Sequence, residues 1–166
     1  MTTFTAEKPS GTRGEIYRDL LLQARGLFEG EHDPVANAAN LAALIGFGLD
    51  DLNWSGFYFL RDGELVLGPF QGKPACVRIA LGKGVCGTAA ARRETLIVPD
   101  VLAFPGHIAC DAASRSEIVV PILDGGALLG VLDVDAPEKN RFGEADRAVL
   151  EECVRVLLPR VDWKAL

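Results

Sequence analysis

Apolar residues recur at helical spacing in the first third of the chain. Between Ile16 and Phe28 they occupy positions 16, 20, 21, 24, 27 and 28, which predicts an amphipathic helix. Asp33 followed by Pro34 is typical of an N-cap and a first-turn proline, so a second helix is expected from there to about Phe47. Two helices therefore precede the first predicted strand.

Two β-hairpins are predicted in the middle of the chain. In the first, WSGFYFLRDGELVLGPF, aromatic and β-branched residues flank Asp62-Gly63, a dipeptide that supplies the positive φ angles of a two-residue turn. The second hairpin, EIVVPILDGGALLGVLDVDAP, turns at residues 124–126. Between them we expect a short strand through Val77 and Ile79, a glycine-rich turn leading into a helix, and the strand TLIVPD. A loop over residues 99–116 follows, and loops of this length usually carry function or are disordered.

The last predicted element is a helix from Gly143 to about Leu158, with Glu144 and Asp146 near the positive end of its dipole. Its apolar residues form one stripe: Phe142, Val149, Cys153, Val156 and Leu157. Helices at both ends with tight hairpins between them predict an α+β domain, a central antiparallel sheet with the N- and C-terminal helices packed on one face. We expect a single domain over residues 12–166 after a flexible N-terminus over residues 1–11.

Composition and charge narrow the class of protein. Seventeen basic and 23 acidic residues among 166 give a net charge of −6, the wrong sign for neutralising phosphates, so nucleic acid is not an expected partner. No apolar run reaches the ~18 residues of a membrane span, and the first twenty residues lack the pattern of a signal peptide. A cytoplasmic protein without membrane contact is expected.

The sequence does not assign a clear reactive role to three of the four cysteines. One is expected in the core, and the other two have both a reactive and a structural interpretation. Cys153 lies in the apolar stripe of the last helix and is expected in the core. Cys86 follows a glycine-rich turn at a predicted helix N-terminus, where backbone N–H groups would lower the pKa of a thiol, but tight packing beside glycines explains it equally well. Cys76 enters a strand beside Lys73 and Arg78, and it either reacts or points inward. The nearest cysteines are ten residues apart, so no structural zinc site is expected.

Cys110 is the strongest candidate for a reactive thiol. It lies in the long loop among polar residues, three positions after His107, whereas unreactive cysteines usually lie among hydrophobic residues. A cysteine hydrolase built from Cys110, His107 and one acid is conceivable, but no spacing enforces it. Three thiols in different loops fit thiol–disulfide exchange better, because that chemistry needs an attacking and a resolving thiol.

Carboxylates and aromatic residues mark a second candidate feature. Asp133 and Asp135 alternate with a valine in the strand VLDVDA, so both point to one face of the sheet. Glu117 begins the paired strand of the same hairpin, and clustered acids raise one another's pKa. Trp54 and Tyr58 share a face of their strand, either as core or as an aromatic wall for a methyl or cationic group. The acids together would suit a substrate with an amino group.

Four motifs resemble one known family: NWSGFYF, LGPFQGKPACVRIALGKGVCGTA, VPDVLAFPGHIACDAASRSEIVVPI and GVLDVDAPEKNRF. They are similar to the free methionine-(R)-sulfoxide reductases, which are single GAF domains. The resemblance runs from about Trp54 to the last helix. It is specific because three cysteines each sit inside a signature, whereas a generic GAF domain would share only the hairpins.

The resemblance implies a role for each of these thiols. Cys110, in HIACD, would be the catalytic thiol that becomes a sulfenic acid. Cys76, in GKPAC, would be the resolving thiol, and Cys86, in GVCG, a second resolving or relay thiol.

The resemblance also implies the substrate site and the partners. Trp54 and Tyr58 would line the pocket for free methionine sulfoxide. Glu117, Asp133 and Asp135 would bind the amino group and assist proton transfer to the sulfoxide oxygen. The family implies a homodimer that is reduced again by thioredoxin. We expect no metal and no bound cofactor. The alternative is a non-catalytic GAF module that binds a small molecule and signals to a partner.

Overall fold

A single six-stranded antiparallel sheet forms the centre of the molecule, with strand order β3-β2-β1-β6-β5-β4. The computed structural model describes residues 4–108 and 111–166. The strands are β1 (Trp54–Arg61), β2 (Glu64–Gly72), β3 (Arg78–Ala80), β4 (Leu96–Val98), β5 (Ser116–Asp124) and β6 (Ala127–Ala136). The two hairpins β1–β2 and β5–β6 pair through β1 and β6, which lie in the middle of the sheet.

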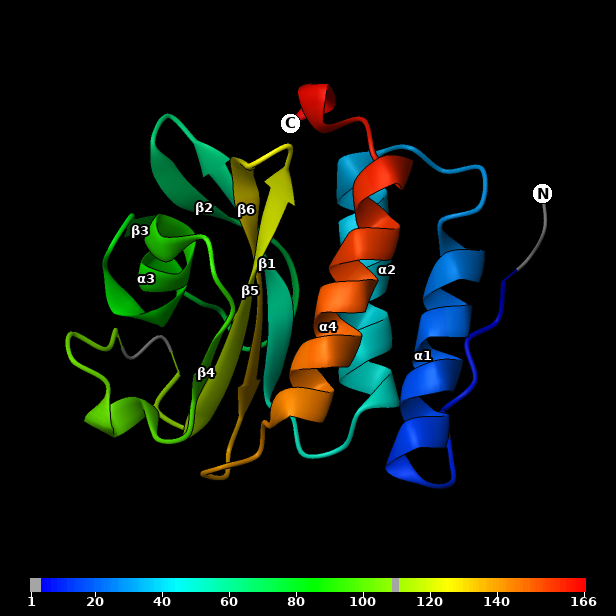
Figure 1. Ribbon diagram of the computed structural model, residues 1–166, viewed down its shortest axis with the longest axis horizontal. Coiled ribbons are helices and arrows are strands. Elements are labelled where there is room, and N and C mark those ends of the chain that lie inside the picture. The colour runs from blue at the N-terminus through cyan, green and yellow to red at the C-terminus, as the bar shows by residue number, and fades with distance from the viewer. Residues whose placement is uncertain (1–3, 109–110) are drawn as a thin grey trace.

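Helices cover the two faces of the sheet unequally. On one face lie α1 (Arg13–Leu27), α2 (Pro34–Gly48) and α4 (Glu144–Leu157), and on the other lies the shorter α3 (Gly84–Arg92) (Figure 1). The expected α+β architecture, with N- and C-terminal helices on one face, is confirmed. None of the described helices combines the length and the apolarity needed to cross a bilayer.

Local signals in the sequence account for the element boundaries. Asp33 caps α2 by accepting a hydrogen bond from the backbone N–H of Ala36 at 2.8 Å, and Pro34 is the first helical residue. Asp62 and Gly63 have φ angles of 51° and 81°, as the turn of the first hairpin requires. These predictions from the sequence are confirmed. The flexible N-terminus predicted for residues 1–11 stays a prediction.

Side-chain alternation divides the interior into two hydrophobic clusters. Phe57 and Phe59 of β1, together with Leu132 of β6, point to the face that α1, α2 and α4 cover. Trp54 and Tyr58 point to the opposite face and pack with α3. The larger cluster stabilises the fold, and the smaller one borders the pocket described below.

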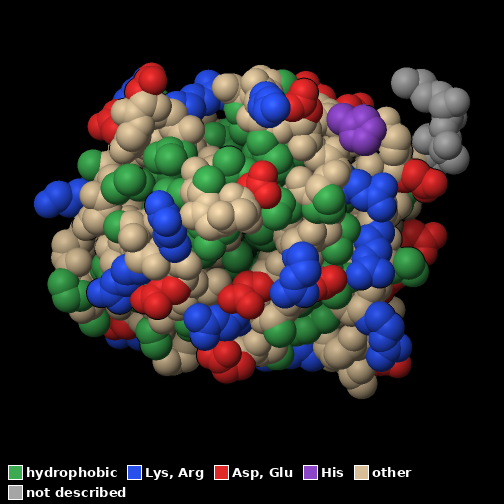
Figure 2. All heavy atoms as spheres, turned by 45° about the horizontal axis from the view of Figure 1, so that its top comes forward, with side chains coloured by type: hydrophobic (Ala, Val, Ile, Leu, Met, Phe, Trp, Pro, Cys, Tyr) green, Lys and Arg blue, Asp and Glu red, His purple; other side chains and the backbone are tan. Residues whose placement is uncertain are grey.

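The face of the molecule in Figure 2 carries basic and acidic side chains interspersed around apolar ones. On this face neither sign of charge forms a continuous patch. The excess of acidic residues that gives the net charge of −6 therefore forms no acidic patch on this face.

One buried carboxylate joins α1, α4 and the loop before α4. Asp146, 1% exposed, accepts hydrogen bonds from Arg13 at 2.8 Å, from Arg141 at 3.0 Å and from the backbone N–H of Gly143 at 2.9 Å. The hydroxyl of Tyr17 also donates to it. Burial raises the pKa of Asp146, but these hydrogen bonds and the charge of Arg141 outweigh burial, so the net shift is downward. The sequence predicted only a favourable helix-dipole position here.

Replacing this carboxylate should destabilise the fold strongly. Asp146→Ala leaves two cations and the hydroxyl of the half-buried Tyr17 without their acceptor, so we expect a loss of about 3–5 kcal/mol in the free energy of unfolding, measured by urea titration at pH 7. Glu144→Ala, an exposed residue of the same helical turn, is the matched control and should change it by less than about 0.5 kcal/mol. Equal effects of the two variants would contradict the assignment.

Candidate active site

A pocket opens on the α3 face of the sheet, with about 530 Å³ of space, part of it open to solvent. Six of the eight residues predicted for the site line it: Trp54, Tyr58, Cys86, Glu117, Asp133 and Asp135. Cys76 is half-buried and packs against the hydrophobic cluster beside the pocket. Cys110 lies outside the described residues. The structure therefore brings the predicted acids, aromatic residues and one thiol together.

Strand register explains why the three acids meet. Glu117 of β5 pairs directly with Asp135 of β6, and Asp133 lies two residues earlier on the same face of β6. Across β1, the partner of Asp133 is Gly56. A Cβ at Gly56 would lie 2.6 Å from the Trp54 ring, so glycine leaves the space that this ring occupies at the pocket.

An aromatic wall faces the acids. The ring of Trp54 stacks on Tyr58 at 6.0 Å and on Phe70 at 5.3 Å between ring centroids. The indole Nε1 of Trp54 donates to the backbone carbonyl of Lys73 at 3.1 Å. The wall therefore also holds the segment that leads to Cys76.

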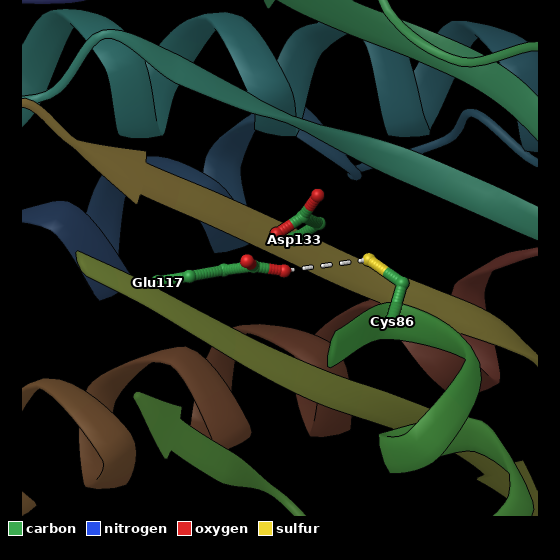
Figure 3. Close-up of side chains that lie close together, drawn as sticks. All are labelled: Cys86, Glu117 and Asp133. Carbon is green, nitrogen blue, oxygen red and sulfur yellow. Dashed lines mark hydrogen bonds between the residues drawn. The ribbon is translucent and has the colours of Figure 1, made fainter. Parts of the chain in front are cut away.

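Cys86 lies at the start of α3 and points toward the acids. Its side chain is 4% exposed, and its Sγ donates to Glu117 Oε1 at 3.7 Å (Figure 3). Burial, followed by the charges of Asp133 and Glu117, raises the pKa of this thiol well above its ordinary value. The expectation that the helix N-terminus lowers this pKa is wrong, because desolvation and two adjacent carboxylates outweigh the backbone N–H groups.

Burial raises the pKa of all three carboxyl groups. For Glu117 and Asp135 burial is the largest cause, followed by the charge of Asp133. For Asp133 burial also raises the pKa, to about 6, while hydrogen bonds from Cys86 and Glu117 limit the shift. Asp133 is thus the carboxyl most ready to ionise near neutral pH, and the other two hold protons that they can donate.

A polar anchor beside the pocket was not predicted. The side-chain amide of Asn53 donates to Asp111 Oδ2 at 3.2 Å and to Ser114 Oγ at 2.9 Å. Lys73 forms an ion pair with Asp111 at 3.4 Å. These bonds fasten the end of the 99–116 loop to the residue directly before β1 and to the segment before Cys76. No sequence signal pointed to Asn53, since its partners lie about sixty residues away.

His107, which the sequence suggested only as the base of a conceivable cysteine hydrolase, lines the same pocket. Its buried Nδ1 has no hydrogen-bond partner among the described residues. Burial lowers its pKa, which favours the neutral ring at pH 7.

Comparison with known proteins places this geometry in a family. The model of the GAF domain family matches residues 39–156, more than half of the chain. The free methionine-R-sulfoxide reductase of Escherichia coli is 49% identical over 153 residues, which cover 90% of this chain and 93% of that protein. The chain belongs to the GAF-domain family of free methionine-R-sulfoxide reductases. The resemblance in the motifs is thereby confirmed.

Further relatives extend the similarity over nearly the whole chain. Protein YtsP of Bacillus subtilis is 54% identical over 156 residues, 93% of this chain and 96% of that protein. A solved structure of the free methionine-R-sulfoxide reductase of Neisseria meningitidis, in complex with its substrate, has a TM-score of 0.93 and 40% identity. It covers 99% of this chain and is itself covered completely. The roles of the individual site residues in this member of the family stay predictions.

Ionisation of the buried carboxyl groups in the pocket should lower the free energy of unfolding. Because the folded state holds the Asp133 proton up to a pKa of about 6, it binds more protons than the unfolded chain between about pH 4 and 6, so the free energy of unfolding falls as pH rises through that window. Asp133→Asn should therefore raise the stability at pH 7.5 by about 1–3 kcal/mol and reduce this fall.

The measurement is urea unfolding of the reduced, ligand-free protein from pH 4.5 to 7.5. Asp124→Asn, which alters an exposed aspartate at the end of β5, is the control and should leave the profile unchanged. A less stable Asp133→Asn protein at pH 7.5 would show that this carboxylate is not under electrostatic strain.

Proposed function

We propose that this protein reduces free L-methionine (R)-sulfoxide to L-methionine, with Cys110 as the catalytic thiol and thioredoxin as the external reductant. One observation carries the proposal: two buried carboxyl groups, a third that is partly exposed, and an aromatic wall converge in a pocket between the segments that hold Cys76 and His107. Membership of the reductase family supports the same activity.

Substrate recognition uses both walls of the pocket. The ammonium group of a free amino acid binds to ionised carboxylate, for which Asp133 is best suited by its pKa of about 6. The S-methyl group packs against the ring of Trp54. A methionine residue within a peptide has lost the ammonium charge to an amide, so it forfeits the electrostatic part of binding.

The chemical step transfers oxygen from substrate to enzyme. The Cys110 sulfur attacks the sulfoxide sulfur, and a protonated carboxyl group, which we assign to Glu117, protonates the sulfoxide oxygen. Methionine leaves as the reduced product, and Cys110 is oxidised to a sulfenic acid. A second thiol then condenses with the sulfenic acid, which forms a disulfide and releases water.

Cys76 suits the resolving role better than Cys86. Cys76 is disulfide-bonded in the structure, whereas Cys86 is a buried free thiol. The raised pKa of Cys86 leaves little thiolate for attack at neutral pH. We therefore assign Cys76 as the resolving thiol and Cys86 as a residue that holds Glu117 by its hydrogen bond.

The proposal also covers the cellular location, the oligomeric state and the reductant. The protein acts in the cytoplasm as a homodimer, without a bound cofactor, and thioredoxin opens the disulfide by thiol exchange. These features follow from the family resemblance in the motifs and from cysteine usage.

Turnover of free methionine sulfoxide tests the activity. Thioredoxin-coupled assays should show reduction of the (R) diastereomer, with far slower reduction of the (S) diastereomer and of N-acetylated methionine sulfoxide. Cys110→Ser should abolish turnover, while Cys153→Ser, a change in the core of α4, should retain it. Substrate binding without oxidation of thiols would instead indicate a non-catalytic GAF module.

The assigned proton donor gives a second test. Glu117→Gln keeps the shape of the side chain but cannot supply a proton, so kcat should fall by about 10²–10⁴-fold with a smaller change in KM. Asp133→Asn should instead act mainly on KM, because it removes the partner of the ammonium group. The reverse pattern in steady-state kinetics would exchange the two roles.

A further inference from the structure

Three potential metal ligands meet at the inner end of the pocket. Cys86 Sγ and one carboxylate oxygen each of Glu117 and Asp133 all lie within 4.8 Å of one another, and all three side chains are buried. Figure 3 shows how they approach from α3, β5 and β6. The proposed reaction gives this cluster no metal, and the spacing along the chain did not predict one.

One distance within this set is close to that of a tetrahedral zinc complex, and the others lie within 4.8 Å. With Zn–S near 2.3 Å and Zn–O near 2.1 Å, sulfur and oxygen ligands at a tetrahedral angle lie about 3.6 Å apart. The separation between Cys86 Sγ and Glu117 Oε1 is 3.7 Å. Small side-chain rotations would therefore close the set around an ion.

A separate observation indicates that one oxygen of this cluster lacks a hydrogen-bond donor or a cation. Asp133 is 7% exposed, yet its Oδ1 is buried and has no hydrogen-bond partner in the described part of the chain. A buried carboxylate oxygen without a donor costs free energy, and a cation supplies what a hydrogen-bond donor would.

The chemistry of the ligands selects the ion. One thiolate and two carboxylates disfavour Mg²⁺ and Ca²⁺, which prefer oxygen ligands alone, and suit a borderline ion such as Zn²⁺. Three protein ligands leave the fourth tetrahedral position to water from the pocket, as in zinc sites that are not purely structural.

We propose that Cys86, Glu117 and Asp133 form a Zn²⁺ site, and that Zn²⁺ bound there blocks the substrate. Binding releases the proton of the Cys86 thiol and the proton of the Glu117 carboxyl group, and it involves no change of oxidation state. The inhibitory part rests on the proposed function, because Zn²⁺ occupies the same carboxylates that we assign to the ammonium group and to proton donation. The binding part does not depend on it.

Cobalt titration tests the binding part without any turnover. The full chain carrying Cys76→Ser and Cys110→Ser, reduced and freed of reductant, is titrated with Co²⁺, which reports thiolate ligation by a sulfur-to-metal charge-transfer band in the near ultraviolet. We expect one Co²⁺ per chain, the visible spectrum of a four-coordinate ion, and displacement by Zn²⁺.

Added to this background, Cys86→Ser should remove the charge-transfer band. Asp133→Asn removes a direct ligand and should weaken binding by more than the roughly 10- to 100-fold that is typical of losing an outer-shell partner. Cys153→Ser is the matched control, since it alters the other buried free thiol and should change nothing. Circular dichroism checks the fold of each variant, and Cys86→Ala replaces Cys86→Ser if the serine disturbs packing. A band that survives both Cys86 variants, or the absence of a band, would overturn the site.

A single-turnover assay tests the inhibition in the wild-type chain. Pre-reduced protein without thiol reductant is mixed with methionine (R)-sulfoxide, and methionine is quantified with and without one equivalent of Zn²⁺. Zn²⁺ should suppress methionine formation and EDTA should restore it. Undiminished formation with Zn²⁺ bound would overturn the inhibitory role, whereas no methionine even without Zn²⁺ would instead refute the proposed function.

Discussion

Burial of three carboxyl groups beside a thiol is the constraint on which the site depends. Glu117, Asp133 and Asp135 carry raised pKa values because burial removes the carboxyl groups themselves from water, and for Glu117 and Asp135 also because the charge of Asp133 lies close by. The arrangement is unfavourable for the empty fold, and it becomes favourable when a cation enters. A pocket of this kind favours an ammonium group or a metal ion over neutral ligands, and its protonated carboxyl groups can act as proton donors.

The contacts that stabilise the fold lie on the opposite face of the sheet from the pocket. The face covered by α1, α2 and α4 contains the larger hydrophobic cluster and the Asp146 ion-pair network, which lie on the far side of the sheet from the pocket. In the described part of the chain, α3 is the one α-helix over the pocket face and loops cover the rest, with Asn53 and Asp111 fastening the loop end. Strained groups on one face are tolerated because the other face supplies the stabilising burial.

Short-range patterns in the sequence were enough for much of this architecture. The Asp62-Gly63 turn, the cap at Asp33 and the alternation of Asp133 with Asp135 each depend on neighbouring residues, and each was predicted correctly. The surroundings of Cys86 were not predictable, because they depend on how α3 docks against β5 and β6. For the same reason the sequence could not show that Asp146 meets Arg13, which is 133 residues away. The predicted role of Cys110 rests on sequence alone, since that residue lies outside the described part of the chain.

The central claim is that the carboxylate pocket delivers a free amino acid sulfoxide to Cys110, whose oxidation Cys76 then resolves. Peptide mapping by mass spectrometry of reduced protein, after one equivalent of free methionine (R)-sulfoxide, tests it most directly. The account predicts a single intrachain bridge between Cys76 and Cys110, and none when the N-acetylated sulfoxide is used. A bridge that involves Cys153, or no bridge with the free amino acid, would contradict it.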